Sequence, residues 1–244
     1  MKGSLYLKTA PVTEPVTTAE AKLHLRVDIT DDDTLIANLV AAARRWIEDV
    51  TGIRMVTQTW NYYLDEFPDD SSEIKLPIGP VASLTSIKYT DTADTVTTWA
   101  ATNYRSDLVS LPARIVLRYA AYWPTADLKE ANGIDIEFVC GYLGSSSLVA
   151  ARASLAAAEV LVAAAVTAGE ITAAKAALAA AAVDVAAAEA LEIAAIPEEL
   201  KLAIKLLVEH WYEHRGAVTE LRLENAPLAI QALLSNFRMW QREM

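Results

Sequence analysis

The sequence is short of the residues that build disulfide frameworks and catalytic thiol sites. Its 244 residues include one cysteine, three histidines and eight glycines. The single cysteine, Cys140, excludes an intramolecular disulfide and suits a reducing compartment. The phosphate-binding patterns GxGxxG and GxxxxGK(S/T), the nucleophile pattern GxSxG and the CxxC pair are all missing. We therefore expect no catalytic residue, cofactor or metal, and nothing in the sequence argues for an enzyme.

Basic residues are also too few and too scattered to bind nucleic acid through its phosphates. The formal net charge is −11 and the isoelectric point is about 4.8, and the sequence has no cluster of Lys and Arg. An acidic protein can still line a channel that repels DNA, which is a hypothesis about shape and not a consequence of composition.

Uninterrupted apolar runs of the length that crosses a membrane are missing as well. Charged residues break each long run of Ala and Val, so none reaches the roughly 20 apolar residues of a membrane span. Residues 1–12 contain no apolar stretch long enough for a secretory signal. We expect a soluble, intracellular chain. The residues that break the runs are Glu159, Glu170, Lys175, Asp184 and Glu189.

The most regular pattern in the chain predicts a central core helix over residues 196–216. Pro197 fits the first turn, where a missing N–H costs nothing, and Glu198 and Glu199 place negative charge at the positive end of the helix dipole. Gly216 can adopt the left-handed conformation that ends a helix. Hydrophobic residues recur at helical spacing on one face: Leu200, Ile204, Leu207, Val208 and Trp211.

Two further patterns predict helices in the first 52 residues. Thr17 and Glu20 have the spacing of a capping box, which opens a helix ending near Val27. The acids at 31–33 cap a second helix, which Gly52 ends. A calcium loop is the alternative for these acids, but the further ligands and the glycine that such a loop needs are absent.

Charged residues in the middle of the second helix have an ordinary structural explanation. Arg44 and Arg45 lie beside Glu48 and Asp49. Opposite charges at this spacing on a helix surface form weak, solvated ion pairs, and we expect such pairs here.

The histidines of the predicted core helix have the spacing of a metal site. His210 and His214 lie four residues apart with Glu209 and Glu213 alongside, and two such histidines can share a zinc ion. The order EHWYEH is not HExxH, however, and the third histidine, His24, is far away in sequence. We favour the polar edge of a core helix, and a metal-dependent hydrolase is the alternative.

Between residues 55 and 142 the pattern changes to short alternating strands separated by polar turns. This pattern predicts a compact antiparallel sheet or a small barrel. Cys140 falls on the buried face of the last strand. The predicted strands are Thr57–Leu64, Glu73–Leu76, Leu84–Tyr89, Val96–Trp99, Arg114–Tyr119 and Ile134–Cys140.

Residues 145–195 are dominated by alanine, the strongest helix former. Apolar residues repeat every seven positions on either side of Gly169, which predicts a hairpin of two closely packed helices of about 20 residues each. Such a hairpin buries little apolar area alone, so we expect neighbouring subunits to brace it; a semi-rigid spacer is the alternative. The residues predicted for this inter-subunit contact are Leu148, Leu155, Val162, Ile171, Leu178 and Val185.

The end of the chain is unusually apolar. After a loop over 217–226, Pro227 opens a last helix, and Met239 and Trp240 follow near the terminus. Burial against the chain's own core is the first explanation for these two residues, and docking on a partner is the second.

These elements together predict an α+β fold with four segments. Residues 1–54 form an N-terminal arm and helices, and residues 196–244 form the C-terminal helices that complete the helical core. Residues 55–144 form an inserted antiparallel β-domain, and residues 145–195 form the Ala-rich helical hairpin insertion.

The order of these elements resembles the head–tail connector (adaptor) proteins of long-tailed, double-stranded DNA phages. The resemblance covers nearly all of residues 8–144 and 196–240. It departs at residues 145–195, where the family pattern has only a short loop. The matching stretches include PVTEPVTTAEAKLHLRVD (11–28), DDDTLIANLVAAARRWIEDVTG (31–52), TQTWNYYLDEFP (57–68), IKLPIGPVASLTSIKY (74–89), IEFVCGY (136–142), IPEELKLAIKLLVEHWYEHR (196–215) and LAIQALLSNFR (228–238).

The resemblance implies a structural virion protein without a cofactor. It implies a homo-oligomeric ring of twelve copies in the virion neck, made in the host cytoplasm, between the portal protein and a stopper or tail-completion protein. DNA would pass through its lumen without sequence-specific binding, and no membrane is involved. Another neck or tail ring component, a stopper or tail-completion protein, is the alternative. The residues predicted to contact the portal are Phe237, Arg238, Met239 and Trp240.

Overall fold

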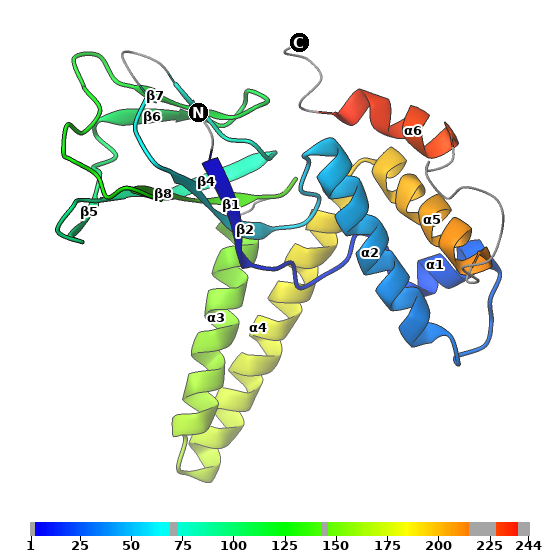
Figure 1. Cartoon of the computed structure of the whole chain (residues 1–244). Helices are drawn as coiled ribbons and strands as arrows, with labels where there is room; N and C mark the ends of the chain where they lie inside the picture. Colours follow the sequence, from blue (N-terminus) through cyan, green and yellow to red (C-terminus); the bar gives the residue numbers. More distant parts are fainter. Residues whose placement is uncertain (1–2, 69–72, 143–145, 215–227, 239–244) are drawn as a thin grey trace.

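The chain folds around two hydrophobic cores, one between helices and one between β-sheets, and a long helical hairpin projects from the junction between them (Figure 1). This arrangement is seen in a computed structural model, which describes residues 3–68, 73–142, 146–214 and 228–238. The predicted α+β class is confirmed, because helices build one core and antiparallel sheets build the other.

The helical core is built by α1 (Thr18–Leu25), α2 (Asp33–Thr51), α5 (Glu198–Glu213) and α6 (Leu228–Leu234), which a short 3-10 turn (Ser235–Phe237) extends. The helices α2 and α5 pack directly against each other, and their buried residues recur at the predicted helical spacing. Full burial of each such side chain contributes about 1.5–3 kcal/mol to folding. The central buried residues are Ile36, Val40, Ile47, Leu200, Ile204 and Leu207.

The first two helices differ in how their N-termini are capped. Thr17 and Glu20 form both hydrogen bonds of the predicted capping box. Asp32 occupies the N-cap position of α2, but its side chain makes no capping hydrogen bond. Its carboxylate instead accepts a hydrogen bond of 2.6 Å from the Tyr212 hydroxyl of α5. A contact between distant helices therefore takes the place of the predicted local cap.

The ends of the helices agree with the sequence in one case and differ in another. Gly52 ends α2 in the left-handed conformation, at φ 76°. The helix α5 ends at Glu213, earlier than predicted. The backbone N–H of the next residue, His214, donates a hydrogen bond to the carbonyl oxygen of His210. The predicted stop at Gly216 lies outside the described residues, as does Pro227.

Two antiparallel sheets share the second core. The larger sheet has the strand order β1-β2-β8-β4-β5, and the smaller sheet has the order β3-β7-β6. Every second residue of the central strand β8 is buried, from Ile134 to Cys140, as the alternation predicted. The strands are β1 (Gly3–Thr9), β2 (Gln58–Leu64), β3 (Ile74–Lys75), β4 (Val81–Thr90), β5 (Val96–Thr98), β6 (Tyr104–Asp107), β7 (Arg114–Leu117) and β8 (Ile134–Cys140).

The N-terminal arm differs from its predicted place because β1 belongs to the larger sheet. It pairs antiparallel with β2, from Gly3 opposite Leu64 to Thr9 opposite Thr59. The arm therefore runs along the β-domain before the chain enters the helical core at α1. Such a pairing is not visible locally, since the paired residues lie 50 to 61 positions apart in the chain.

The Ala-rich segment forms the predicted hairpin from α3 (Ser146–Ala164) and α4 (Ala168–Ala195). The turn lies at residues 165–167, before Gly169, because Thr167 and Glu170 form a capping box that opens α4. Small side chains at the seam allow the two helices to approach closely. The buried seam residues are Ala158, Ala174, Ala181 and Ala188.

Candidate assembly surfaces

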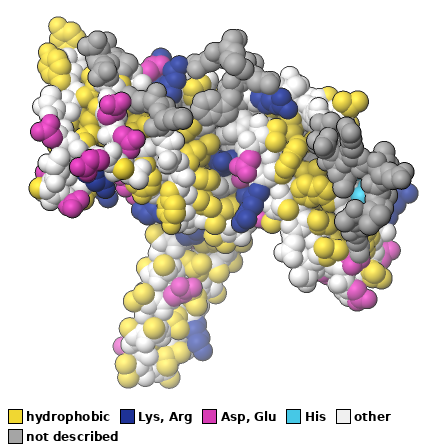
Figure 2. All heavy atoms as spheres, viewed as in Figure 1, with side chains coloured by type: hydrophobic (Ala, Val, Ile, Leu, Met, Phe, Trp, Pro, Cys, Tyr) yellow, Lys and Arg dark blue, Asp and Glu magenta, His cyan; other side chains and the backbone are white. Residues whose placement is uncertain are grey.

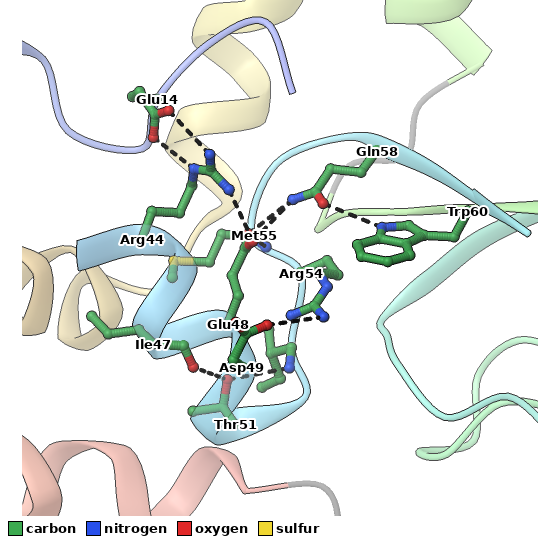
Figure 3. Close-up of polar contacts among 11 residues, drawn as sticks. Glu14, Arg44, Ile47, Glu48, Asp49, Thr51, Arg54, Met55, Gln58 and Trp60 are labelled. Atoms are coloured by element: carbon green, nitrogen blue, oxygen red, sulfur yellow. Dashed lines mark hydrogen bonds and ion pairs between the residues drawn. The ribbon is translucent and has the colours of Figure 1, made fainter. Parts of the chain in front are cut away.

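A buried polar network joins the N-terminal arm, α2 and β2 where the two cores meet (Figure 3). Arg44 of α2 donates hydrogen bonds to Glu14 of the arm at 2.7 and 3.2 Å and to Glu48 at 2.9 Å. Only 4% of Arg44 is exposed, so the predicted solvated ion pair is wrong for this residue. The next residue, Arg45, is exposed.

Glu48 is the acceptor at the centre of this network. Its carboxylate also accepts hydrogen bonds from the backbone N–H of Met55 at 3.0 Å and from the side-chain amide of Gln58 at 3.0 and 3.1 Å. Burial raises the pKa of Glu48, whereas Arg44 and these two donors act in the opposite direction. Because Met55 precedes β2 and Gln58 begins it, Glu48 holds the path of the chain from the helical core into the sheet.

Arg54 extends the same network toward the sheet. Its guanidinium lies 4.9 Å from the centre of the Trp60 ring and 3.4 Å from the carboxylate of Asp49. The Nε and Nη1 atoms are buried and have no hydrogen-bond partner among the described residues. A guanidinium over an aromatic face is attractive, so Arg54 helps to hold β2 against the end of α2.

A second buried contact ties the base of the hairpin to the larger sheet. Glu192, in the last turn of α4, is fully buried. One of its carboxylate oxygens accepts hydrogen bonds from both the backbone N–H and the hydroxyl of Thr57, directly before β2. Its other oxygen has no partner in the described part of the chain. Burial raises the pKa of Glu192.

The residues predicted for an inter-subunit contact lie along the seam between α3 and α4 of the same chain. Those whose side chains are described are half-buried: Leu155, Val162, Ile171, Leu178 and Val185. They alternate with the buried seam alanines, as in a coiled coil. The side chain of Leu148 lies outside the described residues. An inter-subunit role for these six residues stays a prediction.

The outer faces of the hairpin expose apolar side chains to solvent. Figure 2 shows mostly apolar and few charged side chains on its visible face. Near the turn, Leu161, Glu170 and Ala177 border a groove of about 460 Å³ that is otherwise lined by alanines. Within the described part of the hairpin, the large hydrophobic residues that are more than half exposed are Val160, Leu161, Val166, Val183 and Leu191.

By length and composition alone, α4 is apolar enough to cross a membrane. The predicted exclusion of any such span is therefore wrong on this measure. The reason is that alanine counts as apolar, so that isolated charges such as Lys175 and Asp184 do not outweigh it. Composition is weak evidence for a single helix, because a helix of a soluble protein can meet the same criteria.

The C-terminal residues are only partly described. Phe237 packs against the helical core, and Arg238 is half-buried with a buried Nε that has no partner among the described residues. Met239 and Trp240 lie outside the described residues. Contact between these four residues and a portal stays a prediction.

Cys140 belongs to the core between the sheets, whereas His24 and His210 are half-buried outside the core clusters and His214 is exposed. The rings of His210 and His214 are 4.7 Å apart, but no group of three potential metal ligands occurs in the described ranges. His24 lies against α5, where its Nε2 is 3.1 Å from the carboxylate of Glu209. Cys140 is buried, and burial raises the pKa of its thiol.

Sequence reasoning missed both buried glutamates. Glu48 and its i,i+4 partner Arg44 could be seen, but Glu14 lies 30 residues before Arg44 and contacts it only in the folded chain. Glu192 lies 135 residues from Thr57. Glu192 lies seven residues after Val185 and therefore at a seam position. A charged residue in an otherwise apolar seam was the one signal that could have indicated its buried contact.

Part of the chain matches a known protein family. Residues 16–99 match the model of the family described as "Phage gp6-like head-tail connector protein". The matched stretch contains α1, α2 and the strands β2 to β5. The match confirms the resemblance to phage head–tail connectors. No curated protein matches the chain.

Three solved structures contain chains of similar fold. They are described as "Neck of empty GTA particle computed with C6 symmetry", "Virion of native gene transfer agent (GTA) particle" and "Neck of native GTA particle computed with C12 symmetry". The TM-scores are 0.64, 0.63 and 0.62, and the sequence identities are 21%, 20% and 21%. The matches cover 96% of this chain and 95%, 94% and 94% of the other chains.

Proposed function

We propose that this protein is a structural component of the neck of a tailed, phage-like particle, where its copies form an adaptor ring between the portal and the next neck or tail component. The observation that carries this proposal is the match of residues 16–99 to the head–tail connector family. The likeness in fold to chains from GTA necks supports it over nearly the full length.

The proposed ring contains twelve copies. The C6 and C12 symmetries in the descriptions of the similar structures support a cyclic assembly of this order. Neighbours in such a ring meet through heterologous interfaces, in which two different surfaces of each copy are used. The hairpin, with its exposed apolar flanks, is the part of the chain that most needs such a neighbour.

The lumen of the proposed ring is the channel for DNA during packaging and ejection. The formal net charge of −11 suits this role, because an acidic wall repels DNA phosphates and keeps the duplex from adhering. The proposed role is structural and needs no catalytic group or cofactor. We place the portal contact at the C-terminal residues Phe237, Arg238, Met239 and Trp240.

A stopper or tail-completion protein is the second candidate, since such proteins also form rings in the neck or tail. The two candidates differ in what the ring binds. An adaptor binds the portal, whereas a tail-completion protein binds the tail and ignores the portal.

Native mass spectrometry of the purified chain, alone and mixed with its portal, tests the proposal. A ring-sized species, or a monomer that assembles only on the portal, supports the adaptor. A ring that binds tail components and not the portal supports the second candidate. A chain that stays monomeric in every mixture contradicts both.

A further inference from the structure

The two flanks of the hairpin differ in chemistry. One flank, here called the charged flank, is formed by the residues that directly follow the seam alanines and Ala151, which lies seven residues before Ala158: Arg152, Glu159, Lys175, Ala182 and Glu189. Residues that directly precede the larger seam residues form the other, here called the groove flank: Leu161, Glu170, Ala177, Asp184 and Leu191.

Two observations confirm that each set lies on one side of the hairpin. On the charged flank, Arg152 of α3 forms an ion pair of 3.0 Å with Glu189 of α4. On the groove flank, Leu161 of α3 and Ala177 of α4 border the same groove, together with Glu170. The seven-residue repeat then assigns the remaining members to their sides.

Charge is distributed unequally between these flanks. Both cations of segment 146–195, Arg152 and Lys175, lie on the charged flank, whereas the groove flank carries only the acids Glu170 and Asp184. Arg152 is paired with Glu189. Lys175 is exposed and has no ion pair with any described residue. Outside the Arg152–Glu189 pair, the charged flank thus carries one cation, Lys175, and one acid, Glu159, whereas the groove flank carries two acids and no cation. The carboxylate of Glu170 also accepts hydrogen bonds from Val166 and Thr167 of its own chain.

We propose that the groove flank of one hairpin packs against the charged flank of the hairpin in the next copy of the chain. This inference rests on the ring of the proposed function and specifies its contact. Cyclic symmetry places equal residues of all copies at equal height along the axis. Glu170 and Lys175 are five residues apart on α4, about 7.5 Å along the helix, a difference that the lysine side chain can span.

The apolar parts of the flanks fit the same arrangement. Val166 lies in the turn, seven residues after Glu159, and is 86% exposed. It directly follows Ala165, which lines the groove, so it lies at the height of the groove along the hairpin. Val166 of one copy fills the alanine-lined groove of the next. Two groove flanks facing each other would instead bring the acids Glu170 and Asp184 of both copies together, which is unfavourable.

Chemical cross-linking of the full chain tests the polarity of this contact. Ala177→Cys marks the groove flank and Ala182→Cys marks the charged flank, and both alanines are exposed. The lone native cysteine, Cys140, is buried and present in every variant. With a short bismaleimide, the double variant should give a ladder of covalent oligomers up to the full ring. Each single variant should give no more than the wild-type background.

The possible results distinguish a failure of the proposed flank contact from a failure of the proposed function. A ladder absent from a double variant that still forms rings overturns the contact and leaves the proposed function standing. Dimers from either single variant overturn it too, because they show like flanks meeting. A chain that is monomeric with and without portal overturns both.

A groove-filling variant provides a second test with a matched control. Ala173 lines the groove, whereas Ala176 points to solvent on the outer face of the same helix. Ala173→Trp should raise the concentration needed for ring assembly at least tenfold, and Ala176→Trp should leave it unchanged. Equal behaviour of the two variants would overturn the proposal. So would binding of the wild-type chain to phosphatidylcholine vesicles, because it would assign the flanks to a bilayer.

Discussion

Arg44 is the residue on which the junction of the two cores depends most. It lies between two carboxylates, Glu14 and Glu48, and is almost completely removed from solvent. Removing one partner of a buried ion pair is costly because the remaining charge loses both its partner and its solvation. The stability of the junction therefore depends on keeping all three groups together.

Replacing Arg44→Met should lower the free energy of unfolding by about 3 kcal/mol, because Glu48 is left buried without its cation. Urea denaturation followed by tryptophan fluorescence measures this difference. Arg45→Met is the matched control, since Arg45 is adjacent and exposed, and it should change stability by less than about 0.5 kcal/mol. Equal effects of the two substitutions would show that the network adds nothing.

Glu192 makes the stability of the chain depend on pH. Because burial raises its pKa above the ordinary value of 4.5, the folded state holds a proton that the unfolded state has already released. Stability from this group is therefore complete below the unfolded pKa and is lost as the pH rises through the folded pKa. Glu192→Gln removes this titration while keeping an oxygen for the donors of Thr57.

The expected result is that Glu192→Gln becomes more stable than the wild type as the pH rises from 4 to 8, with the difference smallest near pH 4. Thermal unfolding across this range measures it. Glu189→Gln, which breaks the half-buried ion pair with Arg152 and removes a smaller contribution to the raised pKa of Glu192, serves as the control and should show a much weaker trend. A Glu192→Gln difference that is constant with pH contradicts the assignment.

Single residues show where sequence reasoning reaches its limit. The capping box of Thr17 and Glu20 was predictable because all its atoms lie within four residues. The burial of Arg44 was not predicted because it depends on the N-terminal arm. Asp32 occupies the predicted N-cap position, but its side chain bonds Tyr212 on a distant helix and not the first turn of α2. Short-range patterns do not contain these contacts.

At the scale of elements, two glycines mark the two ends of the hairpin and should respond oppositely to alanine. Gly141, after β8, has φ +142°, and an added Cβ would lie 2.9 Å from the backbone nitrogen of Thr57. Gly169, in the first turn of α4, has nothing within 4 Å of an added Cβ. A side chain at position 141 would be strained and crowded, whereas a side chain at position 169 would meet no other atoms.

Gly141→Ala should destabilise the chain by roughly 1–3 kcal/mol through backbone strain, whereas Gly169→Ala should stabilise it by about 0.5 kcal/mol because alanine is the better helix former. Differential scanning calorimetry of both variants checks the opposite signs. A stable Gly141→Ala variant would mean that the chain between β8 and the hairpin can move away from Thr57.

Elements with regular periodicity were predictable, and those defined by partners were not. The core helix α5, the helix α2 and the strand β8 each bury one face, so their periods are visible in the sequence. The strand β6 has only four residues, YRSD, and gives no such pattern. The strand β1 is largely exposed and is defined by its pairing with β2.

At the scale of the molecule, the hairpin is separable from the two cores. Neither core cluster contains a residue of segment 150–195, the part of the hairpin whose side chains the structure describes. Tyr142, just before the segment, packs against the helical core that contains Ile196, just after it. A short linker can therefore join the two ends without disturbing either core.

Replacing residues 145–195 with a short Gly-Ser linker should leave a folded monomer but weaken ring assembly, because the proposed contact between hairpins is removed. Circular dichroism and a cooperative thermal transition check folding, and mass photometry over a range of concentrations checks assembly. Unchanged assembly would show that the hairpin is a spacer and that the ring is held by the cores.

The proposed function rests on the resemblance to a protein family and not on catalytic or ligand-binding residues. The ordered series of helices and strands was sufficient to indicate head–tail connectors, and the family match confirms this over residues 16–99. The candidate contact surfaces were not predictable in the same way. The seven-residue repeat identified the seam within the hairpin, but the difference between its flanks appears only when α3 and α4 are placed side by side.

The hairpin is a long projection that is attached to the rest of the chain at its base only. With 28 residues, α4 is about 42 Å long, and the bonds between Glu192 and Thr57 hold its base against the sheet. For a rod of that length, a tilt of about 5° at the base displaces the free end by about 4 Å. In the proposed ring, the positions of the hairpin tips are therefore fixed at the hairpin bases, where Glu192 accepts two hydrogen bonds from Thr57.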